Sequence, residues 1–167
     1  MVELHVWIIP VAALIPMVMG FIWYNPKVVG TAWMKEAGMD EEKMKGANMA
    51  VIFGLSYLFA CMLAGAMMQM TIHQLGFQSM LMNEPGMGEA GSDIMIFMQE
   101  MMEKYGTNFR TFKHGAFHGF LGSFLIAFPV LATNALFERK SWKYIWINVG
   151  YWAITMTLMG GVVCQFA

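Results

Sequence analysis

The four histidines are the residues of this sequence that could most readily do chemistry. His114 and His118 are four positions apart, so on a helix their side chains would share one face. His5 and His73, like this pair, lie near the ends of long apolar segments. Two histidines at this spacing, joined by a further imidazole or a carboxylate, form a reasonable ligand set for zinc, copper or iron. We therefore consider a metal or haem site built on His114 and His118, with His73 or His5 completing it.

A purely structural interpretation of the histidines also stands, because an imidazole at a membrane interface can keep its apolar body inside and its polar edge in water. No complete metal motif such as H-E-x-x-H accompanies them. The sequence shows no nucleophile–base arrangement, phosphate-binding loop or dinucleotide glycine fingerprint. No catalytic residue is therefore assigned, and an enzyme is the last class of function that we consider.

The sulfur-containing residues suggest no second site. The chain has 20 methionines, and thioethers suit Cu(I). These methionines are scattered rather than clustered, which is typical of a flexible apolar filler. Cys61 and Cys164 both lie in apolar runs without a CxxC pair, so we expect neither a disulfide framework nor a zinc knuckle.

The composition indicates the surroundings in which any such site must be built. Of the 167 residues, 58% are hydrophobic and 13% are charged, whereas a soluble domain usually carries about 25% charged residues. So little charge cannot cover a globule of this size, and membrane lipid must solvate part of the chain. The net charge of −1 argues against a nucleic-acid partner, which would need a basic face.

Four segments are apolar and long enough to cross a bilayer, which takes about 20 residues in a helix. They are residues 4–24, 49–75, 115–137 and 144–166. Pro10 and Pro16 predict a bend in the first segment, which does not have the features of a cleavable signal peptide, and Pro129 predicts a kink in the third. The fold class is therefore an all-α integral membrane protein, with residues 1–167 forming a single membrane domain.

The connections predict an orientation. Seven lysines and arginines lie in the first and third connections, against three on the side of the termini and the second connection. The positive-inside rule then places both termini outside, with all four histidines at the outer face. The third connection, residues 138–143, is short, so the third and fourth spans are expected to be antiparallel neighbours. In the first connection, Asp40 is a candidate helix cap, and that helix is expected to continue into the second span.

The long second connection is expected to contain an amphipathic helix over residues 93–105. Methionines and Tyr105 recur on one face at helical spacing, while Gln99, Glu100 and Glu103 fall on the other. Asp93 could cap this helix and Gly106 could end it. Its excess of acid over base favours docking on the protein itself rather than on anionic lipid.

Aromatic residues gather where spans are expected to leave the membrane on the inner side. Amphipathic rings favour headgroup depth, and Pro26 would stop the first helix after Asn25. Asn25 then has either a turn or a ligand role. The predicted interface anchors are Trp23, Tyr24, Trp33, Trp142 and Trp146.

Small residues in the last two spans predict close helix packing. Gly115, Gly119, Ser123 and Ala127 recur every four residues in the third span, and Thr157 and Gly161 do so in the fourth. The spacing leaves open whether the packing partner is within the chain or another subunit. Asn134 and Asn148 are expected to be buried polar residues that could bond to each other, and the absence of mid-span charged residues argues against coupled transport.

Two stretches of the chain resemble a known family. They are GFIWYNPKVVGTAWMKEAG and PVLATNALFERKSWKYIWINVGYWAITMTLMGGVV, and the pattern WY-x-P-x-x-x-G-x-x-W in the first is the more specific. Both are similar to small bacterial membrane proteins catalogued as domain of unknown function 1761. The resemblance implies four spans and a bacterial inner membrane, and it implies no reaction.

Three functions remain as hypotheses. The first is a non-catalytic membrane protein that acts by helix packing, either as a homo-oligomer or as an accessory subunit of a larger complex. The second is a metal- or haem-binding protein that uses the outer-face histidines. The third is a channel or carrier for a small molecule, lined by Asn134 and Asn148.

Overall fold

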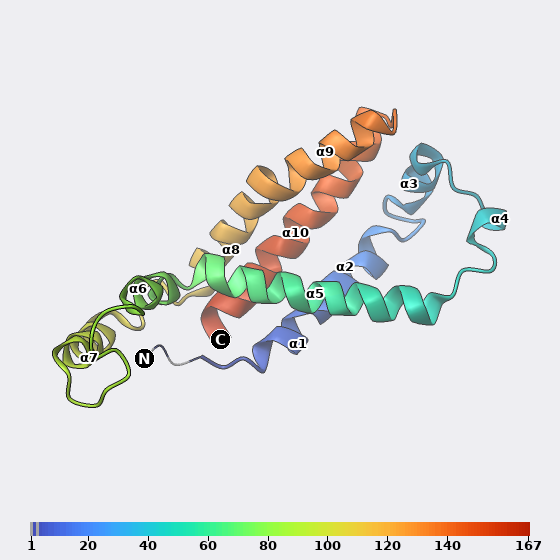
Figure 1. The fold of residues 1–167 in the computed structure, drawn as a ribbon. Helices are drawn as coiled ribbons and strands as arrows, with labels where there is room; N and C mark the ends of the chain where they lie inside the picture. Colours follow the sequence, from blue (N-terminus) through green and yellow to red (C-terminus); the bar gives the residue numbers. More distant parts are fainter. Residues whose placement is uncertain (1, 3) are drawn as a thin grey trace.

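The computed structural model describes residue 2 and residues 4–167, apart from the side chain of Glu41. Every regular element in this part of the chain is helical (Figure 1). Three helices are apolar and long enough to cross a membrane: α5 (Met49–Thr71), the continuous helix Phe112–Phe137, and α10 (Trp142–Phe166). The predicted all-α class is therefore confirmed, and three of the four predicted spans are found as helices long and apolar enough to cross a membrane.

The first predicted span, residues 4–24, is shorter and interrupted. It consists of α1 (Ile8–Ala12) and α2 (Leu14–Trp23), which form a single apolar stretch below spanning length. The break at Ala13 lies between Pro10 and Pro16, in agreement with the predicted bend, because a proline ring crowds the preceding turn and provides no N–H for it. A fourth crossing is therefore not shown by helix length alone.

Helix α10 is the centre of the bundle. In its most apolar 18-residue stretch 50% of the residues are buried, against 22% in each of the other two long helices. Helix α10 packs against α1, α2, α5, α8 (Phe112–Gly122) and α9 (Phe128–Phe137). The helix Phe112–Phe137 runs beside α10 as an antiparallel hairpin, as predicted (Figure 1). The main core joins Met67 of α5 to Met159 and Val163 of α10 and Ile8 of α1.

The first connection is less helical than the sequence suggested. Helix α3 (Gly30–Ala37) is followed by α4 (Glu41–Met44), and Asp40 caps α4 as predicted, its carboxylate accepting a hydrogen bond from the Lys43 N–H (2.8 Å). The prediction that this helix continues into the second span is wrong. Gly46 has a left-handed φ of 87°, and Asn48 caps α5 separately. Glycine is suited to this turn because residues with a side chain rarely adopt a left-handed φ.

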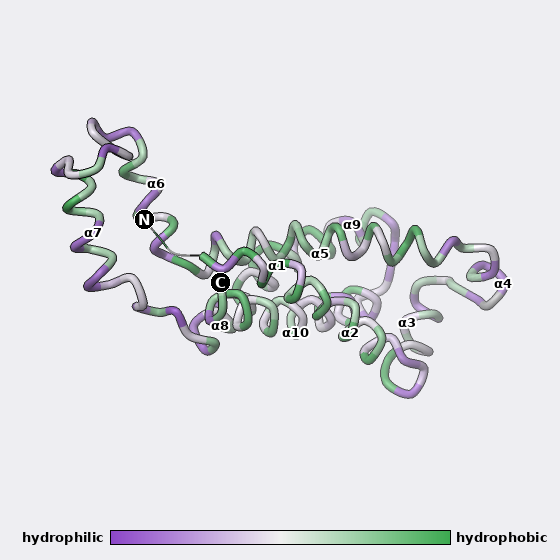
Figure 2. Tube along the Cα trace, turned by 90° about the horizontal axis from the view of Figure 1, so that it is seen from below, coloured by the Kyte–Doolittle hydropathy of each residue, from purple (hydrophilic) through white to green (hydrophobic). Residues whose placement is uncertain are grey.

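The second connection forms a helical hairpin that extends from the bundle at the end where both termini lie (Figure 2). The second span ends at Thr71 rather than near residue 75, because Ile72 is extended and starts a new helix, α6 (His73–Leu81). The predicted amphipathic helix is confirmed as α7 (Asp93–Tyr105), followed by Gly106. Its cap is Ser92 rather than Asp93, since the Ser92 hydroxyl accepts the hydrogen bond from the Met95 N–H.

The helix Phe112–Phe137 changes its geometry near its middle. Helix α8 (Phe112–Gly122) leads into a π-helix, η1 (Ser123–Ala127), and then into α9 (Phe128–Phe137). The predicted irregularity at Pro129 is thus found in the turn before it. A wider π turn there gives room for the proline ring, which would otherwise meet the carbonyl group four residues earlier.

Candidate metal centre

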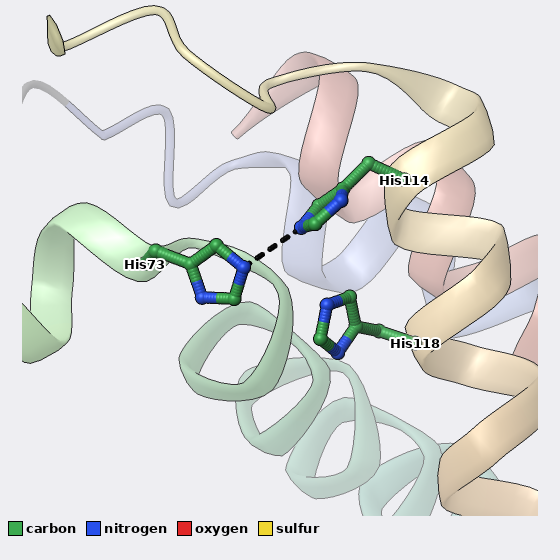
Figure 3. Close-up of side chains that lie close together, drawn as sticks. All are labelled: His73, His114 and His118. Atoms are coloured by element: carbon green, nitrogen blue, oxygen red, sulfur yellow. Dashed lines mark hydrogen bonds between the residues drawn. The ribbon is translucent and has the colours of Figure 1, made fainter.

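Three of the four histidines converge at the end of the bundle that holds the termini. His73, His114 and His118 each offer a ring nitrogen, and these three atoms lie within 4.8 Å of one another (Figure 3). The Nε2 atoms of His73 and His114 are 2.9 Å apart. The rings of His114 and His118 have centroids 4.5 Å apart, as expected for two histidines on one helical face.

Local structure explains how each ring reaches the cluster. His73 is the first residue of α6, and the preceding Ile72 is fully buried in the core, which fixes where α6 begins. Thr111 caps α8, its hydroxyl accepting a hydrogen bond from the His114 N–H (3.3 Å). His114 and His118 therefore lie in the first turns of a helix whose start is defined, opposite the start of α6.

Phe109 forms one wall of the cluster. It has a left-handed φ of 62°, and its ring lies 5.1 Å from the His114 ring and 6.0 Å from the His73 ring. The Phe109 carbonyl accepts a hydrogen bond from the Cys164 thiol (3.3 Å), and the Arg110 guanidinium donates to the carbonyls of Cys164 (3.2 Å) and Ala167. The segment before α8 is thus attached to the end of α10.

The cluster fits a transition-metal ion. In a tetrahedral site with metal–nitrogen bonds of 2.0–2.1 Å, the ligand nitrogens are about 3.4 Å apart. The observed separations, from 2.9 Å to at most 4.8 Å, lie on both sides of this value. His73 is exposed while His114 and His118 are half-buried, so an ion can reach the site and keep a position for water. No carboxylate or thiolate of the described residues joins the three imidazoles.

His5 is not part of this cluster. It is exposed and lines a separate cleft of about 640 Å³, together with Arg110, Gln165 and Ala167.

The triad also favours a bare ion over haem, because the contact of 2.9 Å between His73 and His114 leaves no space for a macrocycle between them.

The small-residue pattern packs α8 against α10 of the same chain. A Cβ atom on Gly115 would lie 2.1 Å from the Gly160 carbonyl oxygen, and one on Gly119 would lie 2.0 Å from that of Met156. On Gly161 it would meet the Phe112 ring at 2.5 Å. The sequence left the partner of this pattern open, and the structure identifies it as intramolecular.

The remaining members of the predicted packing set have smaller roles. Ser123 is buried and donates a hydrogen bond to the Phe120 carbonyl. Thr157 donates to the Ala153 carbonyl within α10. Ala127 is half-buried and lines an apolar cleft between helices.

The aromatic and asparagine residues predicted on the inner side lie together at the opposite end of α10. The Trp23 indole donates to the Ile147 carbonyl (3.0 Å), and the Tyr24 hydroxyl donates to Asn148 Oδ1 (2.9 Å). Trp33 packs edge-on against Tyr24 (5.4 Å). The exposed rings are Trp142 and Trp146. Their role as interface anchors stays a prediction.

The two asparagines are not equivalent. Asn148 is half-buried, and it bonds to Tyr24 and to the Tyr144 carbonyl (2.8 Å). Asn134 is exposed rather than buried as predicted, and no bond to Asn148 forms. Asn134 and Asn148 do share a small pocket of about 180 Å³ at the α9–α10 corner.

Sequence reasoning missed Phe109, and it noted Gly160 only as the neighbour of Gly161. Phe109 follows a polar stretch and carries no signal for its place beside the histidines, although Asn108 before it favours a turn. Gly160 contacts Gly115 more closely than Thr157 or Gly161 does. It stands outside the fourfold spacing, so only the rotation of α10 could assign it.

Comparison with known families gives a match over most of the chain. The family model described as protein of unknown function (DUF1761) matches residues 7–164. Searches of curated proteins and of solved structures found no match.

Proposed function

The chain belongs to the family of proteins of unknown function DUF1761, and from its geometry we propose that it is a membrane protein that binds a transition-metal ion through His73, His114 and His118. The observation that carries this proposal is the convergence of three imidazole nitrogens within 4.8 Å from two separate helices. Imidazole suits zinc and copper, and three such ligands leave one position of a tetrahedral ion open. Zinc or copper binding at this end of the bundle is the expected activity.

Helix packing with another subunit is a second proposal, with narrower support. The glycine pattern that first suggested it is used between α8 and α10. What supports association is α5, whose first half exposes apolar side chains such as Phe53, Leu58 and Phe59. Lipid is the default neighbour of such a face. The channel hypothesis has less support, because the pocket of Asn134 and Asn148 is confined to one corner.

The proposed location is a bacterial inner membrane, with α1–α2 and their flanking residues as a fourth crossing and both termini outside. The seven-to-three bias of lysine and arginine supports this orientation. The triad would then face the outer compartment, where an ion could reach it without crossing the bilayer. A reporter fused to the carboxyl end tests the orientation, and a cytoplasmic signal would contradict it.

The metal proposal is tested by binding measurements on the full-length protein in nanodiscs, with any histidine tag removed. We expect one Zn²⁺ or Cu²⁺ ion per chain, measured by calorimetry and by elemental analysis after dialysis. His114→Ala and His118→Ala should each weaken binding at least tenfold, since each removes one of three ligands. His5→Ala is the matched control and should bind as the wild type does. Unchanged affinity in both triad variants would overturn the proposal.

A further inference from the structure

The three histidines of the triad lie on both sides of the base of the helical hairpin. His73 is the first residue of the hairpin formed by residues 73–110, whereas His114 and His118 lie in the helix that follows it. We infer that the metal ion acts as a clasp, which holds this hairpin on the bundle when bound and releases it when lost. The inference rests on the proposed metal binding and adds a response to it.

The hairpin is a unit with contacts of its own. The Gln74 side-chain amide donates hydrogen bonds to the carbonyls of Tyr105 (3.1 Å) and Asn108 (2.8 Å), which join its first residues to its last. Further out, Phe77 packs against Phe97 (6.1 Å), and Met98 is fully buried. These contacts link α6 with α7, so the hairpin can move as one body.

Its attachment to the bundle is concentrated at its base. On the α6 side the chain reaches the hairpin through the single extended residue Ile72, which interrupts the helical backbone. On the α7 side Phe109 and Arg110 are bonded to α10. Beyond the base, Gln78 accepts a hydrogen bond from the Val2 N–H (3.0 Å), while α7 extends away from the helices of the bundle (Figures 1 and 2).

The position of the triad makes it suited to close this base. Coordination would link His73 to His114 and His118 and so bridge the Ile72 joint. Without the ion, the His73 and His114 rings share one contact of 2.9 Å across that joint. A link across a long loop removes many open conformations of that loop. Opening of the hairpin at His73 then requires the ion to leave.

The size of the effect follows from binding linkage. If the ion binds the closed form alone, a free-ion concentration of about 100 times the dissociation constant makes opening about 100-fold rarer. Exposed apolar side chains of the hairpin, including Met80, Ile96 and Phe97, would be held in one position relative to the membrane surface. Binding of the ion would thereby determine the position of these apolar side chains relative to the bundle.

Hydrogen exchange of the full-length protein in nanodiscs tests the clasp, with Zn²⁺ as the probe and calorimetry on the same samples. Peptides at the base of the hairpin, covering residues 70–76 and 106–111, should exchange up to about 100-fold more slowly with saturating Zn²⁺ in the wild type and in His5→Ala, because opening at the Ile72 joint frees these amides. His73→Ala and His73→Gln should lose this protection. The second variant keeps a polar side chain at the start of α6, which separates loss of a ligand from damage to the helix.

The outcomes separate the clasp from metal binding itself. If Zn²⁺ binds once per chain and the peptides at the base of the hairpin are unaffected, or if protection is confined to α8, the clasp is wrong and the proposed function stands. If calorimetry detects no binding, both are wrong. If His73→Ala and His73→Gln keep both binding and protection, the ion is held elsewhere and the clasp is again excluded.

Discussion

His118 and Gly119 are neighbours in α8, yet they lie on different faces of the helix, and the two faces have different surroundings. A Cβ atom on Gly119 would stand 2.0 Å from the Met156 carbonyl oxygen, so this face of α8 has no room for one more atom. The His118 ring lies 4.5 Å from the His114 ring and 5.1 Å from the His73 ring, on a partly accessible face. One face of the helix is used for packing, and the other leaves room for a ligand.

This difference shows how a membrane bundle can hold a site at its edge. The α8–α10 contact is a backbone-to-backbone approach that fixes α8 against the central helix. Two of the three imidazoles are placed by that contact, while the third arrives on α6 through the joint at Ile72. A site on a rigid element is held more accurately than one on a loop. The rigid part of the triad is therefore His114 and His118, and the adjustable part is His73.

The largest expected effect is on the packed face. Gly119→Ala places a methyl group against the backbone of Met156, and α8 must move away from α10. We expect a loss of about 3 kcal/mol of stability, at the upper end of the usual cost of overpacking. Thermal unfolding in detergent measures it.

Gly54→Ala is the matched control for that variant. Gly54 lies in α5, and apart from its chain neighbours and the backbone of its own helix no atom lies within 4 Å of an added Cβ. The alanine should therefore be neutral or stabilising by up to about 1 kcal/mol through helix propensity. Equal stability of Gly119→Ala and the wild type would mean that the α8–α10 contact is looser than described.

The second effect is on the accessible face. His118→Ala should leave the stability of the metal-free protein within about 0.5 kcal/mol of the wild type, as for other accessible substitutions. The wild type should gain about 2.7 kcal/mol at a free-ion concentration of 100 times the dissociation constant, and the variant should lose most of this gain. Melting curves with and without Zn²⁺ measure both. If the metal-free variant is as unstable as Gly119→Ala, the two faces of α8 do not differ.

The sequence predicted the parts of this comparison that depend on local periodicity. Residues 93–105 were predicted to be a helix, and the structure forms it with those bounds, because methionine spacing and a flanking glycine define it locally. The shared face of His114 and His118 and the packing role of Gly119 likewise follow from spacing by four.

Other parts depend on tertiary contacts that spacing does not contain. The helix break at Ile72 falls inside an apolar run, so periodicity extended the second span through it. That break places His73 beside α8, and the choice of His73 over His5 depends on it. The first span differs from its prediction for a similar reason, because composition extends it over residues 4–24, while the helix covers only Ile8–Trp23.

The third effect tests a half-buried polar contact at the other end of α10. Tyr24→Phe removes the hydroxyl that donates to Asn148 Oδ1 (2.9 Å), which should cost about 1 kcal/mol, the usual net value of a hydrogen bond. A phenolic hydroxyl keeps its proton at ordinary pH, so it remains a donor. Asn134→Ala is the control, since Asn134 is exposed at the same end, and it should be nearly neutral. If Asn134→Ala loses more stability than Tyr24→Phe in unfolding experiments, the stabilising contact involves Asn134 rather than Asn148.

The smallest effect concerns an accessible contact at the same end. The Ser141 hydroxyl donates to Glu36 Oε2 (2.5 Å), and Lys143 Nζ lies 3.7 Å from Glu36 Oε1. The hydrogen bond from Ser141, assisted by the charge of Lys143, lowers the pKa of Glu36 from its usual value. Because the folded state favours the ionised carboxylate, this contact stabilises the protein above the unfolded pKa of about 4.3, and the contribution is lost as pH falls through the lower folded value.

Glu36→Gln should therefore lower the melting temperature slightly at pH 7, and this difference from the wild type should vanish as the pH falls below about 4. Lys143 is exposed, and surface ion pairs contribute little because water and salt screen them. Glu138→Gln is the matched control at the same corner, since within the described residues its carboxylate forms no ion pair. If the difference caused by Glu36→Gln grows in acid, the sign of the linkage is wrong. A further outcome is that Glu36→Gln lowers the melting temperature at pH 7 by more than Tyr24→Phe does. Accessible polar contacts would then stabilise this bundle more than its half-buried ones, and the contrast between the two faces of α8 would not extend to the other end of the molecule.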